Sequence, residues 1–386
     1  MVTYEQVDNY MQELGLRYYK GSNEFITNLA LKTDKKYAGE VAELLNSRAQ
    51  GLNSNNQIFY ELKNRSLTGS LCISAAFDSG LFRHLGNMII DEKEMFSGKI
   101  LDIGCDCGIV TCFIARQYPD CTVVGVDCNE SAVNNARELA EKLGLSNVQF
   151  EVADIFEYQA EEKYDLATSF RGLLDIAQGL TKGVSVIGER SARENAYKDA
   201  FMPLAKAIAN NLKDDASFIS VERYTALYGW LGWMLALEEC GIYAQTDKST
   251  QMVAKDISSP KEYSVTFANR INKTNSIDIY NSVMSVGFKS GTGYDGAMAE
   301  FALYEDSDEI AFADVYKDEK LIHQFATATS NNGKYMFYEA DLDLRKIKYV
   351  NEKKKEKMDK DFLQKREMYN ADIYEIKDYT IKSTVE

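Results

Sequence analysis

The chain has 386 residues, 45% of them hydrophobic, and a formal net charge of -15. Its length and hydrophobic content suffice for a large core and two or three structural units, while the negative charge disfavours binding to nucleic-acid phosphates. The first ten residues lack the basic start and apolar run of a signal peptide, and the longest apolar stretch, Tyr224 to Leu237, is short for a membrane span, so neither secretion nor a membrane partner is expected.

The N-terminal region, residues 1–96, is expected to be mostly helical. Residues 40–45 carry apolar side chains at helical spacing, and the stretch from Leu71 to Ile90 is expected to be helical again. This stretch leads into the region that follows.

The central region, residues 97–272, alternates between short apolar runs and helical patterns. Five runs are expected to be strands: KILDIG (99–104), TVVGVD (122–127), VQFEVAD (148–154), YDLATS (164–169) and ASFISVE (216–222). Helices are expected over residues 109–116, 132–143 and around Trp230, and residues 251–257 with 263–269 are expected to form a closing hairpin. Such alternation predicts a mostly parallel sheet covered on both faces, with ligands bound at the carboxyl ends of its strands.

The C-terminal region, residues 273–386, has a different character and is expected to be an ordered α+β unit. Helices are expected over 276–286 and 294–304, and strands over 310–316, 321–327 and 334–339. The mixed-charge run from Glu352 to Glu367 is typical of a solvated helix.

One segment, LDIGCDCG from Leu101 to Gly108, carries the functional signal. A strand reaches Asp102, a glycine turn follows, and a helix begins near Ile109. Glycines allow close backbone approach to a ligand, and the start of a helix offers free N–H groups to a carboxylate. Asp102 can hold an ammonium group, directly or through water. Together these features suit the amino-acid end of S-adenosylmethionine.

Acidic residues also end the next two predicted strands. Asp127 closes TVVGVD, where its carboxylate can accept hydrogen bonds from both hydroxyls of a ribose. Asp154 closes VQFEVAD, where it can accept from an adenine amino group, with Ile155 beside the ring. Three acids at successive strand ends therefore match three parts of one ligand.

In these residues the chain resembles the class I S-adenosylmethionine-dependent methyltransferases, in which an acidic residue stands two positions before the first glycine of the loop, as Asp102 precedes Gly104. The resemblance covers about residues 99–170. It implies a Rossmann-like, seven-stranded α/β core that binds S-adenosylmethionine through its loop, with Ser169 and Phe170 bordering the methyl group. The residues it implies in cofactor binding are Asp102, Gly104, Cys105, Asp106, Gly108, Asp127, Cys128, Asp154, Ile155, Ser169 and Phe170.

The loop departs from the family pattern at Asp106, where the middle glycine is usual. Aspartate tolerates a left-handed backbone better than most residues do, though less well than glycine. Its carboxylate could oppose the carboxylate of the ligand or favour its sulfonium. A catalytically inactive, methyltransferase-like binding module is therefore kept as an alternative.

Two other kinds of site compete for the same segment. A nicotinamide-binding loop requires glycines where Asp106 and Ile109 stand, and it leaves Asp102 unexplained. A zinc site would need a second close pair of ligands beside Cys105 and Cys107, which the other cysteines do not form, so no metal is expected. Five of the seven cysteines lie between Cys105 and Cys128, which favours reduced thiols and a cytoplasmic location over a disulfide framework.

Acceptor-side residues are harder to assign. His84 is one of two histidines and lies just before the core, so it is the candidate general base, although an ordinary helix histidine is the simpler interpretation. Arg171 could bind an anionic acceptor or form a salt bridge. Aromatic residues around Trp230 and Trp233 could line an apolar pocket, although such a stripe more often belongs to a core.

The expected function is methyl transfer to an O, N or C nucleophile, with a small molecule as the favoured acceptor. Sequences that mark methylation of amino groups in nucleic-acid bases do not follow the fourth strand, so no nucleic-acid partner is expected. A protein acceptor stays open, as does the oligomeric state, for which a homodimer is one alternative.

Overall fold

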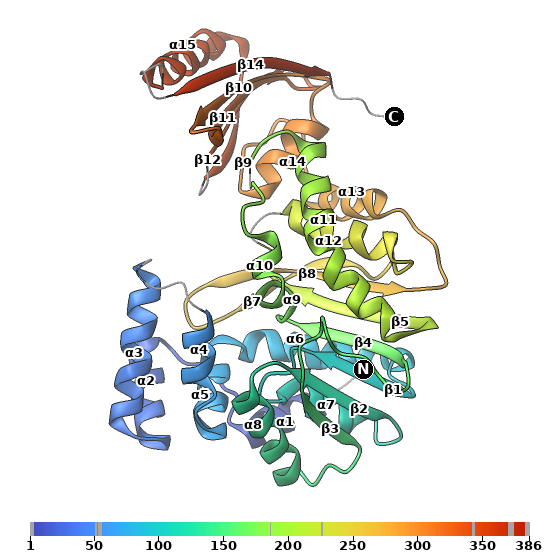
Figure 1. The fold of residues 1–386 in the computed structure, drawn as a ribbon. Helices are drawn as coiled ribbons and strands as arrows, with labels where there is room; N and C mark the ends of the chain where they lie inside the picture. The colour runs from blue at the N-terminus through green and yellow to red at the C-terminus, as the bar shows by residue number, and fades with distance from the viewer. Residues whose placement is uncertain are drawn as a thin grey trace. The chain divides into compact units, whose positions relative to one another are not determined.

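The computed structural model describes residues 4–50, 52, 56–185, 187–224, 227–341, 344–369 and 374–382. The chain divides into two compact units (Figure 1). Unit 1 comprises Met1–Leu180, Met202–Tyr224 and Leu237–Asn275, and unit 2 comprises Thr181–Phe201, Thr225–Ala236 and Ser276–Glu386. The division into three regions made from the sequence stays a prediction, and the N-terminal helices belong to the same unit as the central sheet.

In the part of residues 1–98 that the structure describes, six helices and one short 3₁₀ helix precede the first strand of unit 1. They are α1 (Glu5–Leu14), α2 (Ser22–Lys32), α3 (Lys35–Ala49), α4 (Asn56–Lys63), α5 (Leu67–Phe77), α6 (Ser79–Asp91) and η1 (Lys93–Met95). The prediction of helical structure over residues 71–90 is confirmed, and the backbone leaves the helical conformation only at Asp78, which separates α5 from α6.

The unit 1 sheet has the order β3-β2-β1-β4-β5-β8-β6, and β7 pairs with the same edge of β8 as β6, opposite β5. Neighbours from β3 to β5 are parallel, and β8 is antiparallel to β5, β6 and β7. The strands are β1 (Lys99–Ile103), β2 (Thr122–Asp127), β3 (Val148–Val152), β4 (Tyr164–Phe170), β5 (Leu212–Glu222), β6 (Tyr243–Ala244), β7 (Thr250–Lys255) and β8 (Pro260–Asn269). This is the Rossmann-like α/β core that was expected, seven strands wide, with the closing hairpin formed by β7 and β8.

Helices connect the parallel strands, as is usual for their crossovers, except between β3 and β4, where residues 153–163 form turns and loops. Two of these helices, α7 and α8, contact β2 and β3. The connecting helices are α7 (Ile109–Gln117), α8 (Glu130–Lys142), α9 (Leu173–Ile176), α10 (Gln178–Thr181), α11 (Arg190–Asn210) and α12 (Leu227–Glu239). The last two run from unit 2 into unit 1. None of the helices in the described residues is long and apolar enough to cross a membrane.

The N-terminal helices share a hydrophobic core with the first crossover helix. Tyr10 of α1, Phe82 of α6 and Phe113 of α7 form a ring cluster with centroid distances of 5.2 to 5.7 Å. The Tyr10 hydroxyl also donates to the Ile109 carbonyl at 2.8 Å, at the start of α7. This packing fixes the N-terminal helices against the helix that follows the glycine loop.

Unit 2 contains a six-stranded antiparallel sheet in the order β14-β10-β11-β12-β13-β9. Side chains alternate between its faces, so Met336 and Tyr338 belong to the core that includes α14, and Phe337 to the core that includes Phe362 of α15. The elements are α13 (Ser276–Gly287), β9 (Tyr294–Asp295), α14 (Ala297–Glu305), β10 (Glu309–Lys317), β11 (Lys320–Thr329), β12 (Tyr335–Asp341), β13 (Arg345–Val350), α15 (Glu352–Met368) and β14 (Glu375–Lys382).

The start of α14 and the end of β3 differ from the predicted boundaries. The expected helix over 294–304 begins only at Ala297, because Gly296 has a φ of 67° and the two residues before it pair with β13 as β9. In unit 1, the third strand ends at Val152, so Asp154 lies two residues beyond the strand rather than at its end.

Candidate functional site

The loop from Gly104 to Gly108 connects β1 to α7 in a conformation that requires its two glycines. Both have a left-handed backbone, with φ of 72° and 79°. A Cβ on Gly104 would lie 3.2 Å from the Cα of Gly172, and one on Gly108 would lie 2.8 Å from the Cβ of Ala136. The loop therefore packs closely on its neighbours, and the first turn of α7 begins directly after it with amide groups that have no intrahelical acceptor.

Asp102 lies inside β1 and is 3% exposed. Its two carboxylate oxygens accept hydrogen bonds from the hydroxyls of Thr111 in α7, at 2.5 Å, and Thr168 in β4, at 2.9 Å. Burial raises the pKa of Asp102 to about 6, although both hydroxyls oppose the rise. Asp102 thus joins the strand to two neighbouring elements, and its contact with a ligand ammonium stays a prediction.

This raised pKa gives a test in pH-dependent stability. Because the folded pKa exceeds the ordinary 3.8, the stability from Asp102 is fully present below about pH 4 and is lost as the pH rises through 6. Asp102→Asn keeps a hydrogen-bonding side chain, since a threonine hydroxyl can donate or accept. Between pH 5 and 7 the wild type should therefore lose about 1 kcal/mol relative to the variant in urea unfolding. Parallel pH profiles for the two proteins would refute this.

Asp127 ends β2 beside the loop. Its Oδ2 accepts from the Asp106 amide at 3.0 Å, and its Oδ1 accepts from the Asn129 amide at 2.8 Å. Burial raises its pKa, while the Asn129 amide opposes that rise. The side chain is only partly buried. It therefore links the glycine loop to the end of the neighbouring strand and keeps acceptor capacity for further donors.

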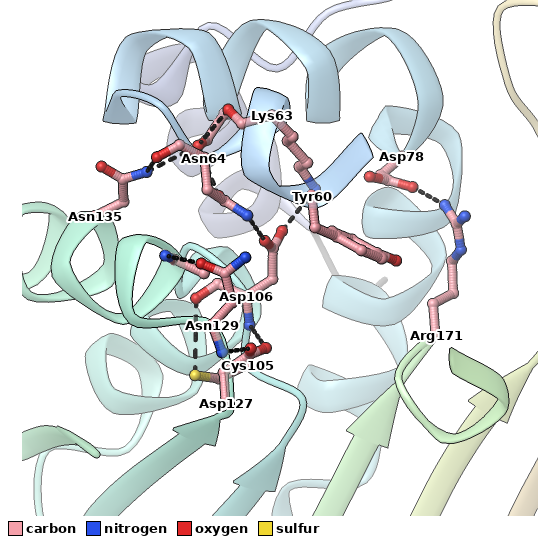
Figure 2. A network of polar contacts seen from close by, with 12 residues as sticks. Tyr60, Lys63, Asn64, Asp78, Cys105, Asp106, Asp127, Asn129, Asn135 and Arg171 are labelled. Carbon is pink, nitrogen blue, oxygen red and sulfur yellow. Dashed lines mark hydrogen bonds and ion pairs between the residues drawn. The ribbon is translucent and has the colours of Figure 1, made fainter. Parts of the chain in front are cut away.

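The loop aspartate is held by residues that sequence reasoning missed. Asp106 has a φ of 47°, and its carboxylate accepts from Lys63 Nζ at 2.6 Å and Asn64 Nδ2 at 3.0 Å (Figure 2). Asn135 of α8 donates to the Asn64 carbonyl at 3.0 Å. These partners come from the end of α4 and from α8, and no local pattern in the sequence connects them to the loop.

The expected adenine-side residues differ in exposure. Cys128 and Asp154 are exposed, whereas Ile155 is buried. Asp154 Oδ1 accepts from the Phe156 amide at 3.0 Å, which forms a tight turn after β3. Cys105 is buried in the loop, and its amide donates to the Val126 carbonyl at 3.1 Å. The structure therefore presents Cys128 and Asp154 to solvent, and their roles stay predictions.

At the end of β4, Ser169 is buried and donates to the Ile103 carbonyl at 2.9 Å, while Phe170 is partly buried. Arg171 follows with a φ of 65° and forms an ion pair with Asp78 (Figure 2). Of the two alternatives for Arg171, the salt bridge is the one present. Asp78 raises the pKa of Arg171.

Further acidic side chains lie at the carboxyl ends of β4 and β5. Glu222 is 2% exposed, and its Oε1 accepts from the Leu173 amide at 2.7 Å, at the start of α9. Burial raises the pKa of Glu222 to about 8, although the Leu173 amide and Arg171 oppose the rise. In α9, Asp175 accepts from Asn56 at 2.6 Å and from the Tyr60 hydroxyl. The carboxyl ends of β4 and β5 are thus rich in carboxyl groups.

The candidate base and the aromatic stripe do not join these residues. His84 is exposed in α6, and no hydrogen bond in the described structure links it to the loop, so its catalytic role stays a prediction. Trp230 and Trp233 are fully buried in unit 2, where they contact Tyr280 and Phe201. Both tryptophans therefore belong to a hydrophobic core, as the simpler interpretation of this aromatic segment predicted.

No group of three or more potential metal-ligating side chains occurs within the described ranges. Cys105 and Cys107 are both buried in the loop, and Cys112 is buried within α7. Burial raises the pKa of each of these thiols. Such thiols favour packing roles, since a metal ligand would need the thiolate.

Comparison with known proteins supports the identity of this core. A methyltransferase-domain family model matches residues 97–225. Protein YbxB of Bacillus subtilis, described as uncharacterized, is 31% identical over 157 residues, covering 38% of this chain and 72% of YbxB.

Two relatives have more specific names. A malonyl-[acyl-carrier protein] O-methyltransferase 2 of Ilyobacter polytropus is 30% identical over 148 residues, covering 36% of this chain and 55% of the relative. A probable (S)-tetrahydroprotoberberine N-methyltransferase 2 of Papaver bracteatum is 32% identical over 113 residues, covering 24% of this chain and 31% of the relative. The chain thus spans only about a third to a half of these two proteins.

The sheet order, with its antiparallel β8 inserted between β5 and β6, agrees with the family fold expected from the glycine loop. The family match begins two residues before β1 and includes the loop, Asp127 and Asp154. The chain therefore belongs to the class I methyltransferases, whose cofactor is S-adenosylmethionine.

Proposed function

We propose that this protein transfers the methyl group of S-adenosylmethionine to an O, N or C nucleophile of a small molecule. The observation that carries the proposal is the connection between the glycine loop and Asp127, made by the Asp106 amide at 3.0 Å. It joins a helix start that suits a carboxylate to a strand-end acid that suits ribose hydroxyls. This donor and acceptor set fits the amino-acid and ribose parts of the cofactor.

The other predicted site residues are assigned to the remaining parts of the cofactor. Gly104, Cys105 and Gly108 are proposed to line the methionine moiety through the loop backbone. Cys128, Asp154 and Ile155 are proposed to lie around the adenine, where exposure leaves the Asp154 carboxylate accessible to an amino group. Ser169 and Phe170 are proposed to border the methyl group from the end of β4. Asp102 is proposed to support the ammonium side of the ligand.

When bound, S-adenosylmethionine supplies an electrophilic methyl on a sulfonium sulfur, and transfer of that methyl leaves S-adenosylhomocysteine. The contribution of the chain is to hold the acceptor in line with the methyl, because positioning alone supplies much of such a rate enhancement. Arg171, which follows β4, and the hydrogen-bonded pair Tyr60 and Asp175 are proposed to do this. His84 stays the predicted base, without a contact that supports it.

A small acceptor is supported by two observations. The net charge of -15 disfavours nucleic acid as a partner. The relative from Papaver bracteatum is named for (S)-tetrahydroprotoberberine, and the relative from Ilyobacter polytropus for malonyl-[acyl-carrier protein]. A protein acceptor and an inactive binding module are the alternatives. The cytoplasmic location and a homodimer stay predictions.

The proposal is tested first by ligand binding and then by the fate of the methyl group. S-adenosylhomocysteine should raise the melting temperature of the native protein, since a ligand that binds only the folded state stabilises it, whereas NAD should not. Incubation of a cell extract with methyl-labelled S-adenosylmethionine and the protein should then place label in the dialysable fraction. Label in the protein fraction would instead support a protein acceptor, and a thermal response to NAD alone would refute the family function.

A further inference from the structure

The aspartate in the glycine loop brings a negative charge to the position where the cofactor carboxylate is expected. Asp106 stands two residues before the N-cap Gly108 of α7, and its side chain is 27% exposed. The nearby Asp127 adds a second carboxylate to the same loop. Without a counter-charge, this loop would repel the carboxylate of an amino-acid ligand.

Lys63 supplies that counter-charge. Its side chain is 7% exposed, and its Nζ lies 2.6 Å from Asp106 Oδ2. Burial lowers the pKa of Lys63, but Asp106 and Asp78 outweigh this and hold the pKa above its ordinary value. Burial likewise raises the pKa of Asp106, but Lys63 outweighs it and the pKa is lowered. Both groups are therefore charged near neutral pH.

The position of Lys63 does not depend on Asp106 alone. It ends α4, and its carbonyl accepts from the Ser70 hydroxyl at 3.1 Å. The single hydroxyl proton of Ser70 is shared between this carbonyl and Asn64 Oδ1, which lies 2.8 Å from the hydroxyl oxygen. Asn135 of α8 donates to both the Ser70 hydroxyl and the Asn64 carbonyl at 3.0 Å. The corner between α4 and α5 is thus fixed on α8, and it places the ammonium group over the loop.

We propose that Lys63 and Asp106 form a compensated pair within the cofactor site, in which Lys63 cancels the charge of the loop aspartate so that the loop can accept the carboxylate end of S-adenosylmethionine. Lys63 is then a positioning residue from the N-terminal helices. The inference rests on the proposed function, because it assumes that this ligand binds at the loop.

The test is a double-mutant cycle measured by calorimetry with two ligands. S-adenosylhomocysteine carries the amino-acid end, whereas 5′-methylthioadenosine has the adenosine and the sulfur without it. Lys63→Met should weaken S-adenosylhomocysteine binding by at least about tenfold, because an unpaired Asp106 opposes the ligand carboxylate. It should change methylthioadenosine binding by less than about threefold. Asp106→Asn, which keeps a residue that tolerates positive φ, should stay within about threefold of wild type for both ligands.

The decisive protein is the double variant Lys63→Met/Asp106→Asn, which should recover most of the affinity lost by Lys63→Met alone. Lys142→Met is the matched control, since it removes a surface lysine that pairs with Glu138 in α8. Lys63→Gln repeats the charge removal with a polar side chain should Lys63→Met fail to fold, and it should show the same loss for S-adenosylhomocysteine alone.

Additive losses in the cycle, or equal losses for the two ligands, would overturn the compensation and leave Lys63 a structural residue of the α4–α5 corner. Wild-type affinity in a folded Lys63 variant would overturn it as well. These outcomes differ from failure of the proposed function, in which the wild-type protein itself would not bind S-adenosylhomocysteine.

Discussion

Asp127→Ala should weaken S-adenosylhomocysteine binding by about tenfold to a few hundredfold. A carboxylate that accepts two ribose hydroxyls makes charge-assisted hydrogen bonds of roughly 1.5–3 kcal/mol each when fully desolvated, and ~1.4 kcal/mol corresponds to tenfold in affinity. Because Asp127 is partly exposed, the free energy of each of these hydrogen bonds should lie toward the lower end of that range. The same carboxylate also accepts from the amides of Asp106 and Asn129, so its loss loosens the loop and acts in the same direction. Calorimetry on folded protein measures the effect.

Two further variants separate the causes. Asp127→Asn keeps one acceptor oxygen and should lose less affinity than Asp127→Ala. Asp120→Ala removes an exposed carboxylate beyond α7 and should bind as wild type does. Asp127→Ala should still fold, but its melting temperature without ligand should lie a few degrees below that of wild type, because the amides of Asp106 and Asn129 lose their acceptor. Unchanged affinity in folded Asp127→Ala would remove the ribose assignment.

The parallel sheet of unit 1 could be predicted because buried strands carry continuous β-branched runs, as TVVGVD does in β2. Its glycine loop could be predicted as well, since positive φ at Gly104 and Gly108 leaves a direct mark on the sequence. The strands β13 and β14 were not predicted. Both carry charged residues between their apolar ones, as in RKIKYV and EIKDYTIK, and their pairing depends on distant partners.

The site was predictable where one element supplies it and not where tertiary packing does. Asp102 and Asp127 stand in strands next to the loop, so their positions follow from the strand pattern. Lys63 reaches Asp106 from 43 residues away through the packing of α4 on α5 and of α5 on α8. The departure from glycine at Asp106 was the available signal, because a charge in a ligand loop calls for a counter-charge somewhere in the fold.

Glu300→Ala should destabilise unit 2 by about 3–5 kcal/mol, because removing one partner of a buried ion pair leaves the other charge in the interior. Glu300 of α14 forms an ion pair with Arg193 of α11, and their side chains are 3% and 4% exposed. Both residues lie in unit 2, as do Trp230 and Trp233, the only two tryptophans of the chain. Tryptophan fluorescence during urea unfolding therefore reports on the unit that contains the pair.

Variants around this pair distinguish a charge effect from loss of packing. Glu300→Gln keeps the shape and an acceptor for Arg193 and should cost less than Glu300→Ala. Replacing both residues with methionine should recover much of the loss, since an apolar pair of similar volume avoids a buried unpaired charge. Glu356→Ala breaks an exposed pair with Lys360 and should change stability by less than about 0.5 kcal/mol. If Glu300→Ala unfolds at the wild-type urea concentration by tryptophan fluorescence, the Arg193 charge does not depend on Glu300, and the other polar groups around Arg193 suffice to hold it.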